Sequence, residues 1–501
     1  MSAAGLGPLL FSREARAQIG STLTIAYNTQ PPSWDPNAGL SAVVPGAQSI
    51  ARSIFDPFFV QREDLSLAPG ACDQFAWNAD RSAITLRVRP GMTWHDGKPV
   101  TPDDVAWNLN RLTDPGLGSP LQVFFASMKN IRVKGDEVSF DVQPYRANML
   151  ERLTFLGCYL LPPHYYKEVG REGFEKQPMG SGPYMFEKFE RNSFLRLKAN
   201  PRYWGGAPAF ETVIFKFATD SATRIAEVER GSADITLDIP WEEFDRLRQK
   251  PALVGVARPM TDIALMFFNN VGPMADPNVR RAAVHAIDKK LIVDRIQRGH
   301  ATPVDTLLAP QYKAYDAAIR TPYDPKLAAE LLAKSGWSRE KPVEFTVQTT
   351  KGYKPKDYET VQAIVEMWRR VGIKANLEVY EIAKHSELRT QHKLAPAAFY
   401  SWSNSTADPE SAVLAALLSK SPSSSWKGGE VDALLMKLVS EKNEAARMEG
   451  YKELNRVVAK DAFILPLFQV HQSIVHRKGL QFEPHLAGWL LPYGMRPAPR
   501  S

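Results

Sequence analysis

The segment 399–409 carries the side chains best suited to binding a small molecule. Two aromatic rings are followed directly by three hydroxyl or amide side chains and then by a proline. A largely apolar pocket that orients its ligand through a few polar groups needs this combination. A core strand followed by an Asx-type turn would have a similar composition and stays open as the alternative. The predicted ligand-binding residues here are Tyr400, Trp402, Ser403, Asn404 and Ser405.

The sequence carries no recognisable catalytic or metal-binding motif. It contains no G-x-S-x-G, P-loop or H-E-x-x-H pattern. His385 and His392 lie two helical turns apart, which is further than a metal-binding pair prefers, so we interpret them as solvated surface histidines. Asp103 and Asp104 are adjacent, and adjacent helical residues point apart. We predict no catalytic residue, no metal site and no cofactor.

Two further groups of candidate residues lie at predicted strand ends. Residues 22–27 alternate as a strand and run into the proline-rich segment 28–36, which cannot continue a sheet. Open α/β sheets place ligands outside their strand ends, so this loop joins the candidate site through Thr29 and Gln30. The apolar strand 263–270 leads into a predicted second lobe. From its end we include Phe268 and Asn269.

The elements that must position these residues alternate between strands and helices, as in an α/β protein. Thr101 is the expected N-cap of a helix that has Pro102 in its first turn. Strands are predicted at 22–27, 83–88, 212–217, 263–270, 343–347, 373–380, 398–402 and 463–468, with a hairpin within 184–199. Helices are predicted at 44–59, 220–230, 324–335, 358–371 and 411–419, with two charged amphipathic helices within 429–460.

Length and charge exclude several classes of protein. The chain has 501 residues, and because domains rarely exceed about 250 residues, two or three lobes are expected. The net charge of +7 comes from Lys and Arg residues without a run of five or more, so we predict no nucleic-acid partner. Cys72 and Cys158 are too few for a disulfide framework; buried free thiols are the commoner outcome, and a disulfide between them stays open.

The first 17 residues are similar to a shortened secretory leader. An apolar run at 3–11 precedes Ala15-Arg-Ala17, which fits the small-x-small cleavage pattern, although the positively charged front part is missing. A disordered N-terminal tail is the alternative. We expect an exported, periplasmic protein.

Several motifs occur in one order along the chain. They are Leu86–Val105 with its Trp-His-Asp-Gly, Gly180-Ser-Gly-Pro-Tyr184, Asn200-Pro-Arg-Tyr-Trp-Gly205, Asn278–Asp288, Tyr323–Gly336 and Pro466-Leu-Phe468. Together they resemble the signatures of family 5 extracellular solute-binding proteins, which are the peptide, nickel and opine receptors of bacterial ABC importers. The resemblance extends from about residue 23 to about residue 475.

This resemblance implies a two-lobed fold of the type II periplasmic binding proteins, with an additional subdomain inserted in the first lobe. The expected division is a leader at 1–17, lobe I at 18–47, 175–263 and 475–501, the inserted subdomain at 48–174, and lobe II at 264–474. Two strands would cross between the lobes near 262–269 and 468–476.

The resemblance also bears on the charge of the solute. In peptide-binding members, an Asp three residues after the loop tryptophan holds the ligand's α-ammonium group, and a second acid lies in the first exit loop. These positions correspond here to Ser405 and Gln30, which are neutral. Burying the ligand's ammonium group without a carboxylate partner costs several kcal/mol of binding free energy. The departure therefore favours a neutral or anionic solute, such as an opine, a sugar-type compound or a modified peptide.

The leading hypothesis is a periplasmic receptor that captures a small-molecule or peptide-like ligand between its lobes by hinge closure. It would act as a monomer and deliver the solute to ABC transporter permease subunits in the inner membrane. An ordinary di- or oligopeptide receptor of the same family is the first alternative. A secreted hydrolase that uses the same site is the alternative from another class.

Overall fold

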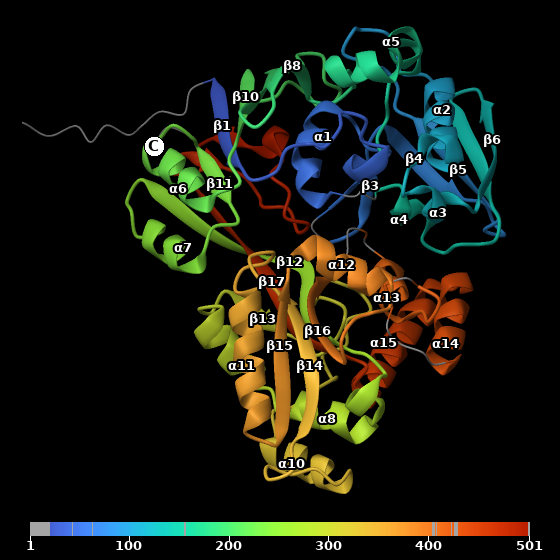
Figure 1. Ribbon diagram of the computed structural model, residues 1–501. Helices are drawn as coiled ribbons and strands as arrows, with labels where there is room; N and C mark the ends of the chain where they lie inside the picture. Colours follow the sequence, from blue (N-terminus) through green and yellow to red (C-terminus); the bar gives the residue numbers. More distant parts are fainter. Residues whose placement is uncertain are drawn as a thin grey trace, which may run out of the picture.

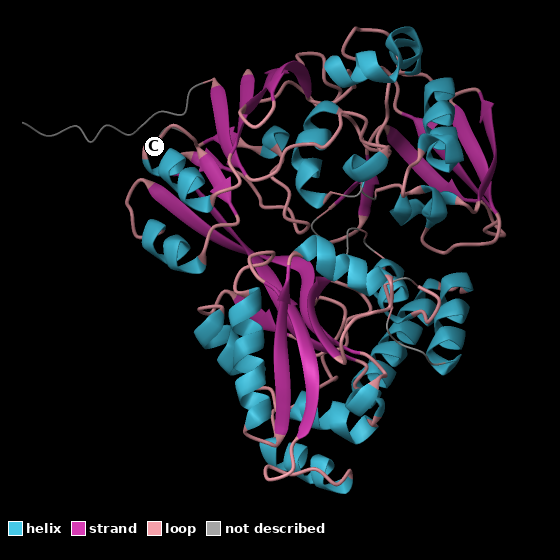
Figure 2. Ribbon diagram, viewed as in Figure 1, coloured by secondary structure: helices cyan, strands magenta, loops and turns pink. Residues whose placement is uncertain are grey.

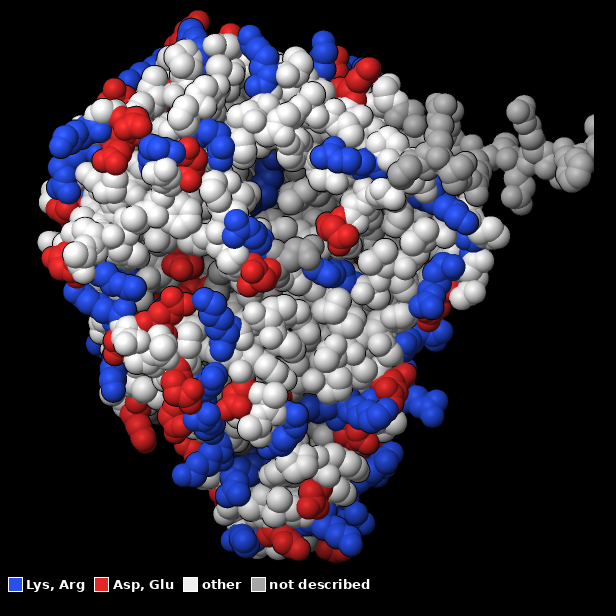
Figure 3. Space-filling model, turned by 180° about the vertical axis from the view of Figure 1, so that it is seen from behind, with Lys and Arg blue, Asp and Glu red and all other residues white. Residues whose placement is uncertain are grey.

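The computed structural model describes residues 21–42, 44–62, 64–154, 157–402, 406, 408–421, 423–424 and 429–498. The predicted leader and Ser403, Asn404 and Ser405 lie outside the described residues. The protein is mixed α/β and has two lobes, which are the upper and lower parts of Figure 1. Seen from behind, the surface carries Lys and Arg side chains interspersed with Asp and Glu side chains (Figure 3). None of the described helices is long and apolar enough to cross a membrane.

One sheet runs through both lobes and joins them. Its strand order is β15-β14-β16-β12-β17-β11-β1-β10-β9-β8, with β13 (Ala301–Pro303) paired to β17. Strands β12 (Leu253–Phe268) and β17 (Ile464–Arg477) are long enough to belong to both parts (Figure 1). Their antiparallel register shifts between Pro259 and Ile263. This register shift overlaps the beginning of the segment predicted for the crossing on β12.

In lobe I, the alternating apolar residues of three parallel strands face helices. These strands are β1 (Thr22–Tyr27), β10 (Thr212–Phe217) and β11 (Ile235–Leu237). The predicted hairpin is confirmed as β8 (Tyr184–Glu190) and β9 (Phe194–Ala199). Around this sheet lie α1 (Gln48–Ile54), α6 (Ser221–Glu229) and α7 (Trp241–Leu247). The helix predicted at 44–59 is shorter, because residues 59–61 pair as strand β2.

The segment predicted as an inserted subdomain holds a separate four-stranded sheet, at the right of Figure 1. Its order is β4 (Cys72–Trp77), β5 (Ala83–Val88), β7 (Glu137–Val142) and β6 (Met128–Lys134), and β2 (Phe59–Gln61) pairs with β3 (Leu67–Pro69) beside it. Its helices are α2 (Pro102–Thr113), α3 (Gln122–Phe125), α4 (Met149–Arg152) and α5 (Pro163–Lys176). Thr101 caps α2 in a capping box with Asp104, as predicted. Cys72 and Cys158 are buried and free.

Lobe II surrounds the other half of the large sheet with helices on both faces (Figure 2). Strands β14 (Val343–Thr350), β15 (Ile373–Tyr380) and β16 (Ala397–Trp402) are mutually parallel neighbours around β14. The helices are α8 (Pro277–His285), α9 (Lys289–Leu291), α10 (Pro325–Lys334), α11 (Asp357–Arg369), α12 (Ile382–Thr390), α13 (Pro409–Leu417), α14 (Gly429–Ser440) and α15 (Glu444–Asp461).

The sequence motifs have structural roles in lobe I. The Asp56 carboxylate accepts hydrogen bonds from the Tyr203 hydroxyl (3.0 Å) and the Trp204 indole N–H (3.2 Å). The His95 ring contacts the carbonyl of Gly182 (3.0 Å) and the N–H of Gly180 (3.2 Å). Each motif thus ties the β8–β9 hairpin to a neighbouring segment. These motif residues therefore stabilise lobe I and are not candidates for binding a solute.

Candidate ligand-binding site

The carboxyl ends of the parallel strands in both lobes lie beside the strand crossing. In lobe II, β16 ends at Trp402, which pairs with Ile263 immediately after the register shift of β12. In lobe I, β11 ends at Leu237, which pairs with Ile474 of β17. Open α/β sheets bind ligands outside such strand ends. Figure 1 shows α12, which follows β15, at the edge of lobe II that faces lobe I.

Trp402 and Tyr400 form an aromatic platform at this edge. Both rings pack edge-on against Phe267, with centroid distances of 5.6 Å for Trp402 and 5.7 Å for Tyr400. The Trp402 indole N–H donates to the Ala412 carbonyl (2.7 Å), and the Tyr400 hydroxyl donates to the His385 carbonyl (2.7 Å). Trp402 stays partly exposed, whereas Tyr400 is buried. Of the two, Trp402 is the ring that a solute would reach.

Arg389 lies over this platform and is the residue that sequence reasoning missed. Its Cζ is 5.2 Å from the Tyr400 ring centroid and 5.3 Å from that of Trp402. Its Nε is buried and has no hydrogen-bond partner, and it forms no ion pair with any described residue. The nearby lysines are already paired, Lys354 with Asp262 (3.0 Å) and Lys356 with Glu242 (2.8 Å). Arg389 is therefore a cation without a counter-charge among the described residues, and it lies beside the partly exposed ring of Trp402.

His385 corrects the prediction of a solvated surface histidine. It is fully buried and stacks on Tyr400 with a centroid distance of 4.4 Å and an interplanar angle of 12°. Neither of its ring nitrogens has a hydrogen-bond partner in the described part of the chain. Burial, reinforced by the charge of Arg389, lowers the pKa of His385 to about 4. The ring is therefore neutral at ordinary pH and supports the platform from behind.

On the lobe I side, Thr29 and Gln30 follow strand β1 as predicted. The Gln30 side chain exchanges two hydrogen bonds with Asn192 in the turn of the β8–β9 hairpin, at 2.5 and 3.1 Å. The Thr29 hydroxyl donates to the side-chain carbonyl of Asn28 (3.1 Å), whose amide donates to the Asp238 carboxylate (3.0 Å). Both candidate residues are partly exposed. Their polar groups are already engaged within lobe I.

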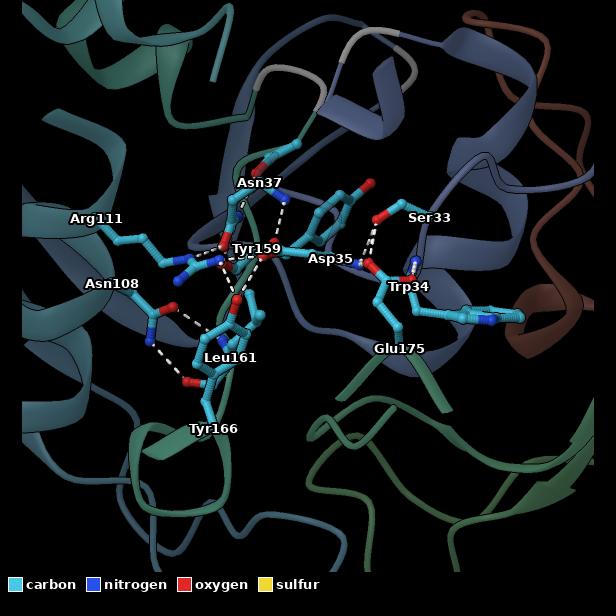
Figure 4. Close-up of polar contacts among 11 residues, drawn as sticks. Ser33, Trp34, Asp35, Asn37, Asn108, Arg111, Tyr159, Leu161, Tyr166 and Glu175 are labelled. Carbon is cyan, nitrogen blue, oxygen red and sulfur yellow. Dashed lines mark hydrogen bonds and ion pairs between the residues drawn. The ribbon is translucent and has the colours of Figure 1, made fainter. Parts of the chain in front are cut away.

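The loop that carries these residues is anchored farther along by Glu175 (Figure 4). The Glu175 carboxylate accepts hydrogen bonds from the Ser33 hydroxyl, from the Trp34 N–H (2.7 Å) and from the Asp35 N–H (3.4 Å). Glu175 belongs to α5, so this helix holds the exit loop in place.

A second anchor of the same loop is a buried ion pair between Arg111 and Asp35 (Figure 4). Tyr166 donates to the Asp35 carboxylate (3.1 Å), and Arg111 lies over the Tyr166 ring at 4.4 Å. Burial raises the pKa of Asp35, although Arg111 opposes the shift. Asn37 adds a hydrogen bond to the Tyr159 carbonyl (3.2 Å). The loop is thus fixed before any solute arrives.

Phe268 and Asn269 do not join this site. Phe268 pairs with Ala397, at the opposite end of β16 from Trp402, and is buried against Trp368 in the core of lobe II. The Asn269 backbone N–H donates to the Pro396 carbonyl (2.9 Å). Strand β12 enters lobe II at its hinge end and finishes at the far end, so the last residues of the strand lie remote from lobe I.

The acids near this edge are largely committed to protein partners. Asp408 caps α13 through the Glu410 N–H (2.9 Å) and forms a buried ion pair with Arg447. Asp262 pairs with Lys354, and Asp238 accepts from Asn28 and from Gln472 (3.2 Å). In the described ranges, no group of three or more His, Cys, Asp or Glu side chains is arranged to hold a metal ion.

Three relatives match most of the chain. The heme-binding protein A of Haemophilus influenzae is 23% identical over 436 residues, which cover 81% of this chain and 80% of that protein. The glutathione-binding protein GsiB of Salmonella paratyphi A is 24% identical over 505 residues, with 97% and 93% coverage. The di/tripeptide-binding protein 2 of Pseudomonas aeruginosa is 25% identical over 494 residues, with 92% coverage of both chains.

Solved structures confirm the fold. The ABC transporter substrate-binding protein CtaP of Listeria monocytogenes superposes with a TM-score of 0.85 at 21% identity, covering 95% of this chain and 99% of that chain. Residues 66–424 match the model of the bacterial extracellular solute-binding proteins, family 5. This match spans well over half of the sequence. The chain belongs to the family 5 bacterial extracellular solute-binding proteins.

Proposed function

We propose that this protein is the periplasmic receptor of an ABC importer and that its solute is peptide-like, with a free carboxylate bound by Arg389 against Trp402. The single observation that carries the proposal is the guanidinium group of Arg389, which lies over the aromatic platform and forms no ion pair with any described residue. A guanidinium group matches a carboxylate in geometry and charge, and such a charge-assisted bond contributes roughly 1.5–3 kcal/mol.

The peptide-like class is favoured over the opine and sugar classes by the named relatives. Two of the three relatives are named for glutathione and for di- and tripeptides. The third relative is named for heme. Carboxylate recognition suits all of these solutes, so Arg389 is consistent with each name.

The structure offers the amino group of a peptide no clear acidic partner among the described residues. Gln30 is neutral and bonded to Asn192, and Asp238, Asp262 and Asp408 already have protein partners. Ser405, the position at which the family's peptide receptors carry an acid, is also neutral. We therefore expect the carboxylate to contribute more to affinity than the amine does. A peptide with a blocked amine should bind about as well as the free peptide.

Delivery would follow the hinge mechanism, in which a solute that touches both lobes stabilises their closed arrangement. The long strands β12 and β17 are the elements that bend, and the inner-membrane permease is the partner that receives the solute. We further propose an exported monomer without a cofactor.

Calorimetry with a tripeptide and its C-terminal amide tests the carboxylate. We expect the amide to bind at least about tenfold more weakly, and Arg389→Gln to weaken the free acid by a similar factor while leaving the amide unchanged. Arg339→Gln is the matched control, because Arg339 is exposed in lobe II away from the platform. Equal affinities for acid and amide would refute carboxylate recognition by Arg389.

The other solute classes and the hydrolase alternative need a separate experiment. A thermal-shift panel of opines, sugars and peptides at equal concentration should show its largest shift with a peptide, since a ligand stabilises the folded state more, the more tightly it binds. Recovery of the bound solute after long incubation should return it intact. A cleaved product would support the hydrolase instead.

A further inference from the structure

A basic hollow of about 360 Å³ lies in lobe II, outside the candidate ligand-binding site. Its walls are α8, the C-terminal part of α15 and the loop 316–321. Val284, Ile319 and Ala459 supply an apolar floor. Its volume falls within the range of small-ligand pockets. The charged residues that line it are Arg281, His285, Asp316, Arg320, Arg456 and Lys460.

Three of the cations in the basic hollow lack a counter-charge. Arg456 is fully compensated, because it pairs with Asp316 (2.8 Å), Glu449 (3.3 Å) and Glu453 (3.0 Å). In contrast, Arg281, Arg320 and Lys460 form no ion pair with any described residue. The only hydrogen bond that Arg320 makes with its side chain in the described structure is to the adjacent Ile319 carbonyl (3.0 Å). Three uncompensated like charges around one hollow create a positive potential that attracts an anion.

The helix termini explain only one of these charges. Lys460 lies in the last turn of α15, where a cation is favourable because it faces the negative end of the helix dipole. Arg281 precedes the last turn of α8, and Arg320 lies in a loop. Neither arginine therefore interacts with the negative end of a helix dipole. Helix stabilisation therefore does not account for these two guanidinium groups, which form no ion pair with any described residue.

The basic hollow is also distant from the residues proposed to bind the transported solute. Ala462, which lines the hollow, lies two residues before the start of strand β17 at Ile464, and the first residues of β17 pair with the far end of β12. From Ile464 to Gln469, which pairs with Ile263 beside Trp402, the strand advances roughly 17 Å, at about 3.3 Å per residue. Figure 1 shows α8 in the part of lobe II away from lobe I. A ligand here would not compete with the solute.

We propose that the basic hollow binds a phosphate group, with Arg281, Arg320 and Lys460 as its cationic partners. A phosphate monoester carries a charge of about −1.5 to −2 and three strong acceptor oxygens, which match three cations that line one hollow better than a single carboxylate does. Arginine in particular presents paired donors that fit phosphate oxygens. The phosphate belongs either to a soluble compound or to the headgroup of an anionic lipid, since both present the same chemistry.

Titration of the full chain with inorganic phosphate at constant ionic strength tests the hollow. We expect binding at millimolar phosphate that Arg320→Gln and Lys460→Gln each weaken about tenfold. Arg295→Gln is the matched control, because Arg295 is exposed in the same lobe and does not line the hollow. Both test residues are exposed, and unchanged unfolding midpoints would verify that the variants fold. Absence of phosphate binding, or an equal loss in Arg295→Gln, overturns the proposal.

Vesicles distinguish the two sources of phosphate. Sedimentation with phosphatidylglycerol vesicles but not with phosphatidylcholine vesicles, reversed by Arg320→Gln and by added phosphate, would assign a lipid headgroup. Phosphate binding without sedimentation would assign a soluble phosphate compound. Sedimentation that Arg320→Gln and Lys460→Gln leave unchanged counts against the hollow as the binding site.

Discussion

Trp402 combines two roles, since it packs against Phe267 and presents a partly exposed ring beside Arg389. We expect Trp402→Ala to weaken solute binding by about 2 kcal/mol, as the loss of a buried aromatic anchor does. Trp402→Phe keeps an aromatic face but loses the hydrogen bond to Ala412, so its effect on affinity should be smaller. Calorimetry on both variants, with unfolding midpoints measured in parallel, checks this order. An unchanged dissociation constant in Trp402→Ala would remove the ring from the site.

His385 should make the stability of the folded protein depend on pH. Its pKa is lowered in the folded protein, so the folded state binds the proton less readily than the unfolded state does. The stability contributed by the neutral ring is therefore complete above about pH 6.5 and is lost as the pH falls towards about 4. We expect His385→Phe, which preserves the stacking on Tyr400, to reduce this decline. Urea unfolding at pH 7.5, 5.5 and 4.5 compares the two proteins. His392→Phe, at an exposed position, is the control: it loses the contact of the ring with the Ser424 carbonyl (3.0 Å), but its stability should decline with falling pH as in the wild type.

The exit loop after β1 depends on α5 for its position. We expect Glu175→Ala to release three hydrogen-bond donors of residues 33–35 and to accelerate amide exchange across the loop. Glu172→Ala on the same helix is the matched control, because Glu172 is exposed and makes no described hydrogen bond. Exchange measured by mass spectrometry on peptides that cover 28–38 gives the comparison. Equal protection in the two variants would show that Arg111 and Asp35 alone hold the loop.

The regular elements could largely be predicted from sequence because their signals are local. Strand β1 and the N-cap Thr101 are confirmed, since alternation and capping depend on neighbouring residues. The lobe I half of β12 was not predicted, because Gly255 and Pro259 argue against a strand. The structure accommodates Pro259 at the register shift where the strand leaves lobe I.

The candidate site could be predicted only in part. Tyr400 and Trp402 carry a compositional signal, whereas Arg389 is a lone arginine on a helix and becomes notable only when its missing partner is seen. Phe268 was misplaced because apolar patterns do not indicate which end of a strand faces the other lobe. The burial of His385 could not be predicted, because the sequence of α12 has no apolar face that would indicate which side of the helix is buried.

The two lobes also meet away from the crossing strands, through an interlobe contact between the inserted subdomain and α13. Arg152 of α4 pairs with Glu410 at 2.7 Å, with side chains that are 9% and 1% exposed. Close by, the Ala147 N–H donates to the Val439 carbonyl (3.3 Å), and the Lys442 ammonium donates to the Asp80 carbonyl (2.6 Å). Residues of the inserted subdomain thereby touch lobe II directly. If the lobes separate to release solute, this contact must break.

The Arg152–Glu410 pair should therefore influence solute affinity from a distance. Arg152→Met leaves the Glu410 carboxylate buried without its counter-charge when the lobes are together, which we expect to weaken binding by about 2 kcal/mol, roughly thirtyfold. Because a buried ion pair is replaceable by apolar residues of similar volume, adding Glu410→Met should restore most of the affinity. Lys313→Gln is the control, since the Lys313–Glu444 pair is 77% and 57% exposed and should contribute almost nothing. Solute titration, with small-angle X-ray scattering of each variant with and without solute, measures both affinity and compaction. Wild-type affinity in Arg152→Met would show that this contact forms without favouring the closed arrangement.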